Sequence, residues 1–150
     1  MPPFILRKLD HVVLRVRDLQ TSLRFYMDVL GCRFERQQPE IGLYQVRAGD
    51  SLIDLLPVTE PLGRQGGAAP GREGRNLDHF AIQIDPFNES ELRTYCREHG
   101  VSEPNIGSRY GAEGEGPSLY ISDPDGNVVE LKGPPSPLAK IGHGEYTFAA

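Results

Sequence analysis

Two histidines and two carboxylates in this chain have the residue types and the sequence contexts of metal ligands. His11 and His79 each follow a Leu-Asp pair and open an alternating apolar stretch, "LDHVVLRV" and "LDHFAIQI". Asp54 and Glu130 each lie in a short apolar stretch, "GDSLIDLLP" and "PDGNVVELKGP". Two neutral imidazoles and a carboxylate bind a divalent ion and leave positions open for the oxygens of a substrate. A second carboxylate beside the ion can then move a proton.

The elements that must position these residues repeat along the chain. After the first histidine strand, Asp18 is suited to cap a helix that Gly31 ends. After the second, Asn88 is suited to cap a helix that Gly100 ends. Strand-like stretches follow, "CRFERQ" and "GLYQVRAG" in the first half and "PSLYISD" in the second, before each closing strand. Each half is therefore interpreted as βαβββ, and the sequence predicts an α+β fold of two such modules.

The expected organisation has four parts. Residues 1–62 form the first module, 63–76 a linker rich in glycine and proline, 77–133 the second module, and 134–150 a C-terminal tail. With 150 residues in total, each module is too small to bury much surface alone, so we expect the two to form one domain.

Side-chain alternation indicates where the candidate ligands point. In the first strand Val12, Leu14 and Val16 share one face, which suits packing under the helix, and His11 and Arg15 lie on the other. The same alternation places the other three candidate ligands on the faces away from the helices: His79, Asp54 and Glu130. If the two sheets curl toward each other, these faces line one cavity. Whether the modules pair within one chain or across a homodimer stays open.

Composition excludes several classes of function. A net charge of -5 with no cluster of basic residues argues against a nucleic-acid partner. No apolar run is long enough to span a bilayer, and the N-terminal stretch "MPPFILRKLD" is unlike a signal peptide. Two cysteines indicate neither a disulfide framework nor a cysteine-based zinc site. We therefore expect a cytoplasmic protein without a membrane partner.

The chain resembles the vicinal oxygen chelate superfamily over roughly Leu9 to Lys132. The stretches that carry the resemblance are "LDHVVLRVRDLQTSLRFYMDVLGCRFE", "LDHFAIQI" and "YISDPDGNVVEL". That superfamily includes glyoxalase I, extradiol dioxygenases, methylmalonyl-CoA epimerase, fosfomycin-resistance thiol transferases and the metal-free bleomycin-resistance proteins. The resemblance is specific for the superfamily and much less so for one reaction within it.

The resemblance implies a ligand set. The family's two histidine positions fall on His11 and His79, and its final-strand glutamate on Glu130. A fourth position, usually glutamate or glutamine in glyoxalase I, is Asp54 here. Because aspartate is one methylene shorter, Asp54 is open to three roles: metal ligand, catalytic base, or structural hydrogen-bond acceptor. The implied cofactor is a divalent ion, with Zn, Ni, Fe(II) and Mn as the candidates.

These features predict a metal-dependent enzyme of the glyoxalase I type, a lyase or isomerase that acts on a small oxygenated metabolite. Catalysis is assigned to Glu130 or Asp54. Arg15, Gln83 and Arg109 are the candidate substrate contacts. Arg109 lies in a glycine-rich stretch, Gly107 to Tyr120, that is interpreted either as a mobile loop that closes over substrate or as a solvated surface loop. Two alternatives remain. A non-haem Fe(II) dioxygenase would use two histidines and one carboxylate, and a metal-free binding protein would use no ion.

Overall fold

The structure, a computed structural model, forms two compact units. It describes residues 1–138, 140–142 and 144–149. Unit 1 comprises Met1–Asn76 and Asp123–Gly126, and unit 2 comprises Leu77–Ser122 and Asn127–Ala150. Among the described residues, no helix combines the length and the apolar character that crossing a membrane requires.

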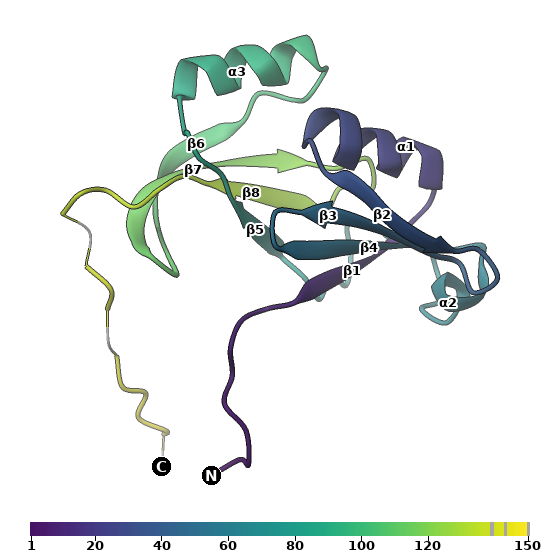
Figure 1. Cartoon of the computed structure of the whole chain (residues 1–150), viewed down its shortest axis with the longest axis horizontal. Helices are drawn as coiled ribbons and strands as arrows, with labels where there is room; N and C mark the ends of the chain where they lie inside the picture. The colour runs from purple at the N-terminus through teal and green to yellow at the C-terminus, as the bar shows by residue number, and fades with distance from the viewer. Residues whose placement is uncertain (139, 143, 150) are drawn as a thin grey trace. The chain divides into compact units, whose positions relative to one another are not determined.

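Unit 1 contains a mixed four-stranded sheet in the order β1-β4-β3-β2 (Figure 1). The strands are β1 (His11–Val16), β2 (Arg33–Gln38), β3 (Leu43–Ala48) and β4 (Ser51–Pro57). β1 runs parallel to β4, and the other neighbours are antiparallel. Three short helical segments complete the unit: α1 (Leu19–Arg24), the π-helical turn η1 (Phe25–Val29) and α2 (Pro61–Arg64).

The first helical stretch, α1 continued by η1, begins and ends where the sequence predicts. The Asp18 carboxylate accepts a hydrogen bond from the Thr21 backbone N–H at 2.7 Å, which satisfies a helix-terminal donor. Gly31 follows η1 with a φ of 75°, a left-handed conformation that other residues rarely adopt. Under the helical segments, the apolar face of the sheet is buried. Its most buried members are Leu14, Val16, Val46, Ile53 and Leu55.

Unit 2 repeats this arrangement with a second four-stranded sheet, in the order β5-β8-β7-β6 (Figure 1). The strands are β5 (His79–Gln83), β6 (Asn105–Gly111), β7 (Gly114–Ser122) and β8 (Val128–Lys132), and the helix is α3 (Glu89–Glu98). The Asn88 side chain caps α3 by accepting from the Glu91 N–H. β5 pairs with β8 in parallel, as β1 does with β4. The predicted α+β fold of two βαβββ modules is confirmed.

The expectation of a mobile loop at Gly107 to Tyr120 is wrong. β6 and β7 form an antiparallel hairpin there, in continuous register from Asn105 with Tyr120 to Gly111 with Gly114. The glycines of this hairpin make room for close packing. A Cβ on Gly111 would lie 2.9 Å from the Lys132 Cε, and one on Gly116 would lie 2.6 Å from the Pro134 carbonyl oxygen. Contact with backbone therefore explains Gly116, whereas Gly111 faces only the flexible end of the Lys132 side chain.

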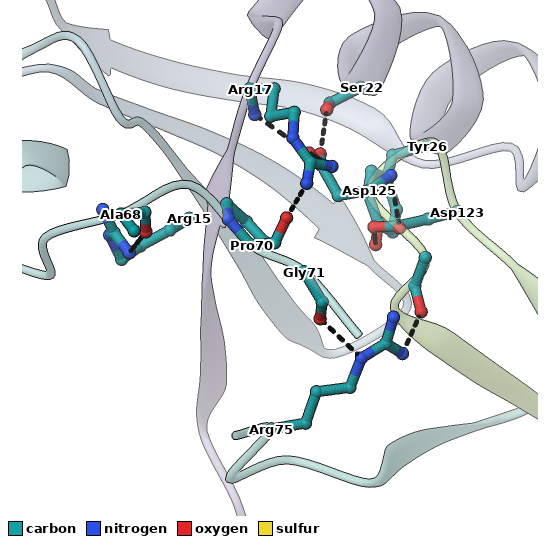
Figure 2. A network of polar contacts seen from close by, with 11 residues as sticks. Arg15, Arg17, Ser22, Tyr26, Ala68, Pro70, Gly71, Arg75, Asp123 and Asp125 are labelled. Carbon is teal, nitrogen blue, oxygen red and sulfur yellow. Dashed lines mark hydrogen bonds and ion pairs between the residues drawn. The ribbon is translucent and has the colours of Figure 1, made fainter. Parts of the chain in front are cut away.

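Two aspartates of the "DPDG" turn are buried in unit 1 and anchor the turn to the helical segment (Figure 2). The Tyr26 hydroxyl, completely buried, donates to Asp123 Oδ2 at 2.7 Å. Asp125 accepts from the Arg17 backbone N–H at 3.0 Å and from the Ser22 hydroxyl at 3.4 Å. These carboxylates therefore have a structural role, and the turn motif does more than close a hairpin.

Arg75, in the linker, also hydrogen-bonds to the "DPDG" turn. Arg75 donates from Nε to the Gly71 carbonyl oxygen at 2.9 Å and from Nη1 to the Gly126 carbonyl oxygen at 2.5 Å (Figure 2). Arg17 reaches the linker as well, by donating from Nη2 to the Pro70 carbonyl oxygen. The glycine- and proline-rich linker is therefore held by arginine donors at several backbone carbonyls.

Replacing Tyr26 by phenylalanine should destabilise the fold. The change removes a buried donor to a carboxylate and leaves the ring in place, so we expect the free energy of unfolding to fall by about 1.5–3 kcal/mol. Urea denaturation measures the effect. Tyr146→Phe is the matched control, because that side chain is 79% exposed. Equal stability of both variants and the wild type would contradict the structural role of the turn.

The pH dependence of stability should carry a contribution from Asp125. Burial raises the pKa of this carboxyl, and Asp123 nearby raises it further, although the Arg17 N–H opposes the shift. A group with a raised folded-state pKa stabilises the fold below the unfolded pKa, about 3.9 for aspartate, and loses that stabilisation as the pH rises through the folded value. Asp125→Asn should therefore gain stability relative to the wild type from about pH 4 upward. Urea denaturation across this window checks the trend, and parallel pH profiles would contradict it.

Candidate functional site

In unit 1, strand register places His11 and Asp54 on one face of the sheet. His11 pairs with Leu52 across β1 and β4, so Asp54, two residues further along β4, is a diagonal neighbour on the same face. Asp54 is only 5% exposed. The Gln45 amide on β3 donates from Nε2 to Asp54 Oδ1 at 2.9 Å, which leaves the second carboxylate oxygen available.

The His11 side chain is exposed, and its Nδ1 contacts the carboxylate of the preceding residue, Asp10. Its Nδ1 lies 2.7 Å from Oδ1 of Asp10. The hydrogen bond to Asp10 raises the pKa of His11, and the negative charge of Asp54 raises it further. No ion pair joins His11 directly to Asp54 among the described residues. Asp54 is therefore near the imidazole without contacting it.

Unit 2 contains the corresponding pair in direct contact. His79 pairs with Val128, and Glu130, two residues further along β8, is 6% exposed. His79 Nε2 lies 3.2 Å from Glu130 Oε2, and His79 Nδ1 lies 2.7 Å from Asp78 Oδ2. Two donor atoms bonded to one ion at about 2.0–2.2 Å, with tetrahedral or octahedral angles, lie roughly 2.9–3.5 Å apart. The His79–Glu130 separation therefore suits two ligands of the same ion.

The same strand register in both units brings one further polar residue beside each buried carboxylate. The sequence alone did not indicate these two residues. The third strand of each sheet places Gln45 beside Asp54 and Tyr120 beside Glu130. Burial raises the pKa of Tyr120, and the charge of Glu130 raises it further. The repeat of Leu-Asp-His with a later carboxylate could have pointed to these positions, because each is the cross-strand partner of that carboxylate.

Each unit thus supplies one imidazole and one buried carboxylate. In the part of the chain that the structure describes, no three His, Cys, Asp or Glu side chains gather as a metal-binding group. Convergence of the four candidate ligands, which lie in different units, therefore stays a prediction. The donor chemistry fits a borderline divalent ion such as Zn²⁺, since imidazole nitrogens and carboxylate oxygens are its usual non-thiolate ligands.

Arg109 lies on the same face of the unit 2 sheet as the His79–Glu130 pair. Its guanidinium carbon is 4.4 Å from the centroid of the Tyr120 ring, and that ring meets the His79 ring edge to face at 5.2 Å. Arg109 also donates from Nη1 to the Ser118 hydroxyl at 3.1 Å. A half-buried guanidinium therefore lies one aromatic ring away from the candidate ligands.

The other two candidate substrate contacts are placed differently. Arg15 donates to three backbone carbonyls of the linker region, from Nε to Gly63 at 2.8 Å, from Nη1 to Ala68 at 2.9 Å and from Nη2 to Gly67 at 2.6 Å. These bonds favour a structural role, and substrate binding by Arg15 stays a prediction. Gln83 is exposed at the end of β5, and no side-chain contact within the described part of the chain tests its assignment.

The chain is similar to known proteins over most of its length. The model of the Glyoxalase/Bleomycin resistance protein/Dioxygenase superfamily matches residues 8–131. A lactoylglutathione lyase of Salmonella typhimurium is 30% identical over 132 residues, which cover 83% of this chain and 90% of the lyase. Biphenyl-2,3-diol 1,2-dioxygenase 3 of Rhodococcus globerulus is 28% identical over 128 residues, but the match spans only 62% of that enzyme.

A solved structure agrees with the fold. The crystal structure of virulence protein STM3117 from Salmonella typhimurium aligns with a TM-score of 0.66 at 26% sequence identity, covering 87% of this chain and 98% of that one. The sequences of these two proteins are 29% identical over 132 residues.

Proposed function

The chain belongs to the Glyoxalase/Bleomycin resistance protein/Dioxygenase superfamily, and from this premise we propose a metal-dependent enzyme of the glyoxalase I type, which moves a proton on a small oxygenated metabolite. The observation that carries the proposal is the buried Asp54, which lies on the ligand face with one oxygen held by Gln45 and the other available. A proton-transfer enzyme needs such a second carboxylate, whereas a site that only binds a metal does not.

Three side chains are proposed to hold the ion: His11, His79 and Glu130. Supporting this set are the 3.2 Å separation of His79 Nε2 from Glu130 Oε2 and the equivalent register of His11 in unit 1. When bound, a divalent ion would polarise the substrate oxygens and stabilise negative charge that develops on them. Convergence of the two units, within one chain or across a homodimer, is part of the proposal.

Asp54 is proposed to be the base. Its free carboxylate oxygen would accept a proton from the substrate carbon and return it to the neighbouring carbon or oxygen. Gln45 fixes the orientation of the carboxylate through its hydrogen bond, and burial keeps bulk water from competing for the proton. Glu130 is assigned to the ligands because it contacts His79 directly, which Asp54 does not do with His11.

Turnover of a glutathione hemithioacetal is the direct experiment for this proposal. Purified protein loaded with Zn²⁺, Ni²⁺ or Mn²⁺ should convert the hemithioacetal of methylglyoxal, and in D₂O the carbon that receives the proton should carry mainly the substrate's own hydrogen, because the buried carboxylate returns it before exchange with solvent. Absence of turnover with every metal would contradict the glyoxalase I type.

A second candidate function is a non-haem Fe(II) dioxygenase. It would use the same three ligands, two histidines and one glutamate, and it needs no base, so it accounts for the lack of an ion pair between His11 and Asp54 without assigning Asp54 a catalytic role. Oxygen consumption with a catechol-like substrate after loading with Fe(II) would select this alternative. Protein that binds no metal at all would instead favour a binding protein related to the bleomycin-resistance members.

Loss of the Arg109 guanidinium should weaken binding of an anionic substrate. Charge-assisted hydrogen bonds contribute about 1.5–3 kcal/mol, so we expect Arg109→Ala to raise KM for a carboxylate-bearing substrate roughly 10- to 150-fold while the metal content stays unchanged. Steady-state kinetics measure the change, and Arg109→Lys should restore part of it. Arg97→Ala, on α3, is the control. An unchanged KM in Arg109→Ala would remove Arg109 from the site.

A further inference from the structure

Both Leu-Asp-His repeats place an aspartate against the ring of the following histidine. Asp10 Oδ1 lies 2.7 Å from His11 Nδ1, and Asp78 Oδ2 lies 2.7 Å from His79 Nδ1. The two contacts occur in different units and have the same length, so each module builds the arrangement from its own residues.

The contact determines which ring nitrogen remains free. A carboxylate accepts a hydrogen bond, so Nδ1 carries the proton and Nε2 of the neutral ring keeps its lone pair. In unit 2 both ring nitrogens face a carboxylate, but Nδ1 lies 2.7 Å from Asp78 Oδ2 and Nε2 lies 3.2 Å from Glu130 Oε2, so the closer Asp78 is the preferred acceptor of the ring proton. The aspartate therefore fixes both the tautomer of His79 and the direction in which its metal-binding nitrogen points.

Packing does not explain these aspartates. The side chains of Asp10 and Asp78 are 81% and 98% exposed, and neither contributes to the core of its unit. A hydrogen bond at such a site is weakened by competing water, but it acts between adjacent residues and has only to favour one tautomer over the other. Because they are exposed, the residues can be replaced without creating a cavity.

We propose that Asp10 and Asp78 are positioning residues, which hold His11 and His79 as Nδ1–H tautomers so that Nε2 is available to a divalent cation. The cation part of this inference rests on the proposed function, whereas the tautomer part does not. Residues that hydrogen-bond a ligating histidine typically change metal affinity by about 10- to 100-fold.

The tautomer part is tested on the metal-free full chain by long-range ¹H–¹⁵N correlation spectra of the histidine rings, recorded at a pH of about 9. His99 provides an internal reference, because its Nδ1 donates to the Tyr95 carbonyl oxygen at 2.9 Å. We expect His11 and His79 to share the Nδ1–H pattern of His99. Asp10→Ala should convert only His11 to the Nε2–H form, and Asp78→Ala only His79.

The cation part is tested by titrating the same proteins with Zn²⁺ against a chromogenic chelator. Asp10→Ala and Asp78→Ala should each bind Zn²⁺ roughly 10- to 100-fold more weakly than the wild type. The Asn variants should restore most of the affinity and the Nδ1–H pattern, since an amide oxygen still accepts the bond. Asp50→Ala, also exposed, is the control.

The outcomes separate the two proposals. A wild type that binds no Zn²⁺ overturns the proposed metal site, while the spectra still decide the role of the aspartates. A wild type with Nε2–H rings, or Ala variants with unchanged spectra, overturns the inference. Unchanged Zn²⁺ affinity in both Ala variants, in a wild type that binds the ion, overturns it as well.

Discussion

Replacement of His79 by alanine is expected to abolish stoichiometric metal binding. The variant removes one of three proposed ligands and leaves the buried Glu130 without its partner at 3.2 Å. The loss in affinity should exceed the roughly 10- to 100-fold that follows removal of a residue hydrogen-bonded to a ligand. Equilibrium dialysis followed by elemental analysis measures the bound metal, and His11→Ala should behave in the same way.

Two further variants show whether the loss of metal is specific to the His79 imidazole. His99→Ala removes an exposed histidine that stacks on Tyr95, outside the ligand faces, and should bind metal like the wild type. His79→Gln places an amide donor beside Glu130, so it separates the loss of a ligand from the loss of a polar neighbour of that buried carboxylate. Full metal occupancy in folded His79→Ala would exclude this residue from the site.

Replacement of Asp54 by asparagine is expected to reduce turnover by about 10²- to 10⁴-fold, the usual contribution of general acid–base catalysis. The asparagine oxygen can still accept the bond from Gln45 and fills the same volume, but it cannot take up a proton. Metal content should stay unchanged if Asp54 is the base. The kinetic loss should fall on kcat, because proton transfer belongs to the transition state.

The metal content of the Asp54 variants separates the roles that the sequence left open. Loss of metal together with activity would make Asp54 a ligand. Asp54→Asn with wild-type turnover and wild-type metal content would leave only a structural role, as an acceptor for Gln45.

Much of the fold could be predicted from the sequence because its signals are local. Asp18 and Asn88 cap their helices within three residues, and Gly31 ends the first helical segment with a positive φ. The alternation in β1 likewise identified the face that becomes buried. These features depend on side chains and backbone a few residues apart, which a single sequence displays directly.

The β6–β7 hairpin could be predicted only in part, because the packing around its glycines depends on contacts distant in sequence. Gly111 makes room for the Lys132 side chain, and Gly116 makes room for the backbone at Pro134. The backbone contacts of Arg15 could not be predicted either, because its carbonyl partners lie about fifty residues further along the chain. Glycine content and charge alone suggested a mobile loop and a substrate contact.

The candidate site was predictable in part. The repeat gave His11, His79, Asp54 and Glu130, and the register of the two sheets confirms that each pair shares a face within its own unit. Gln45 and the positioning contacts of the two Leu-Asp-His repeats required side-chain geometry, since nothing in an isolated strand indicates which neighbour a carboxylate will meet.

Binding of one ion by His11, His79 and Glu130 is tested most directly by a crystal structure of the Zn²⁺-loaded chain, with diffraction recorded at the zinc absorption edge. We expect one anomalous peak for each chain, at about 2.0–2.2 Å from Nε2 of His11, Nε2 of His79 and a carboxylate oxygen of Glu130. These ligands would come either from one chain or from two copies. A zinc peak bonded to the residues of one unit alone, or no zinc peak at either histidine, would contradict this expectation.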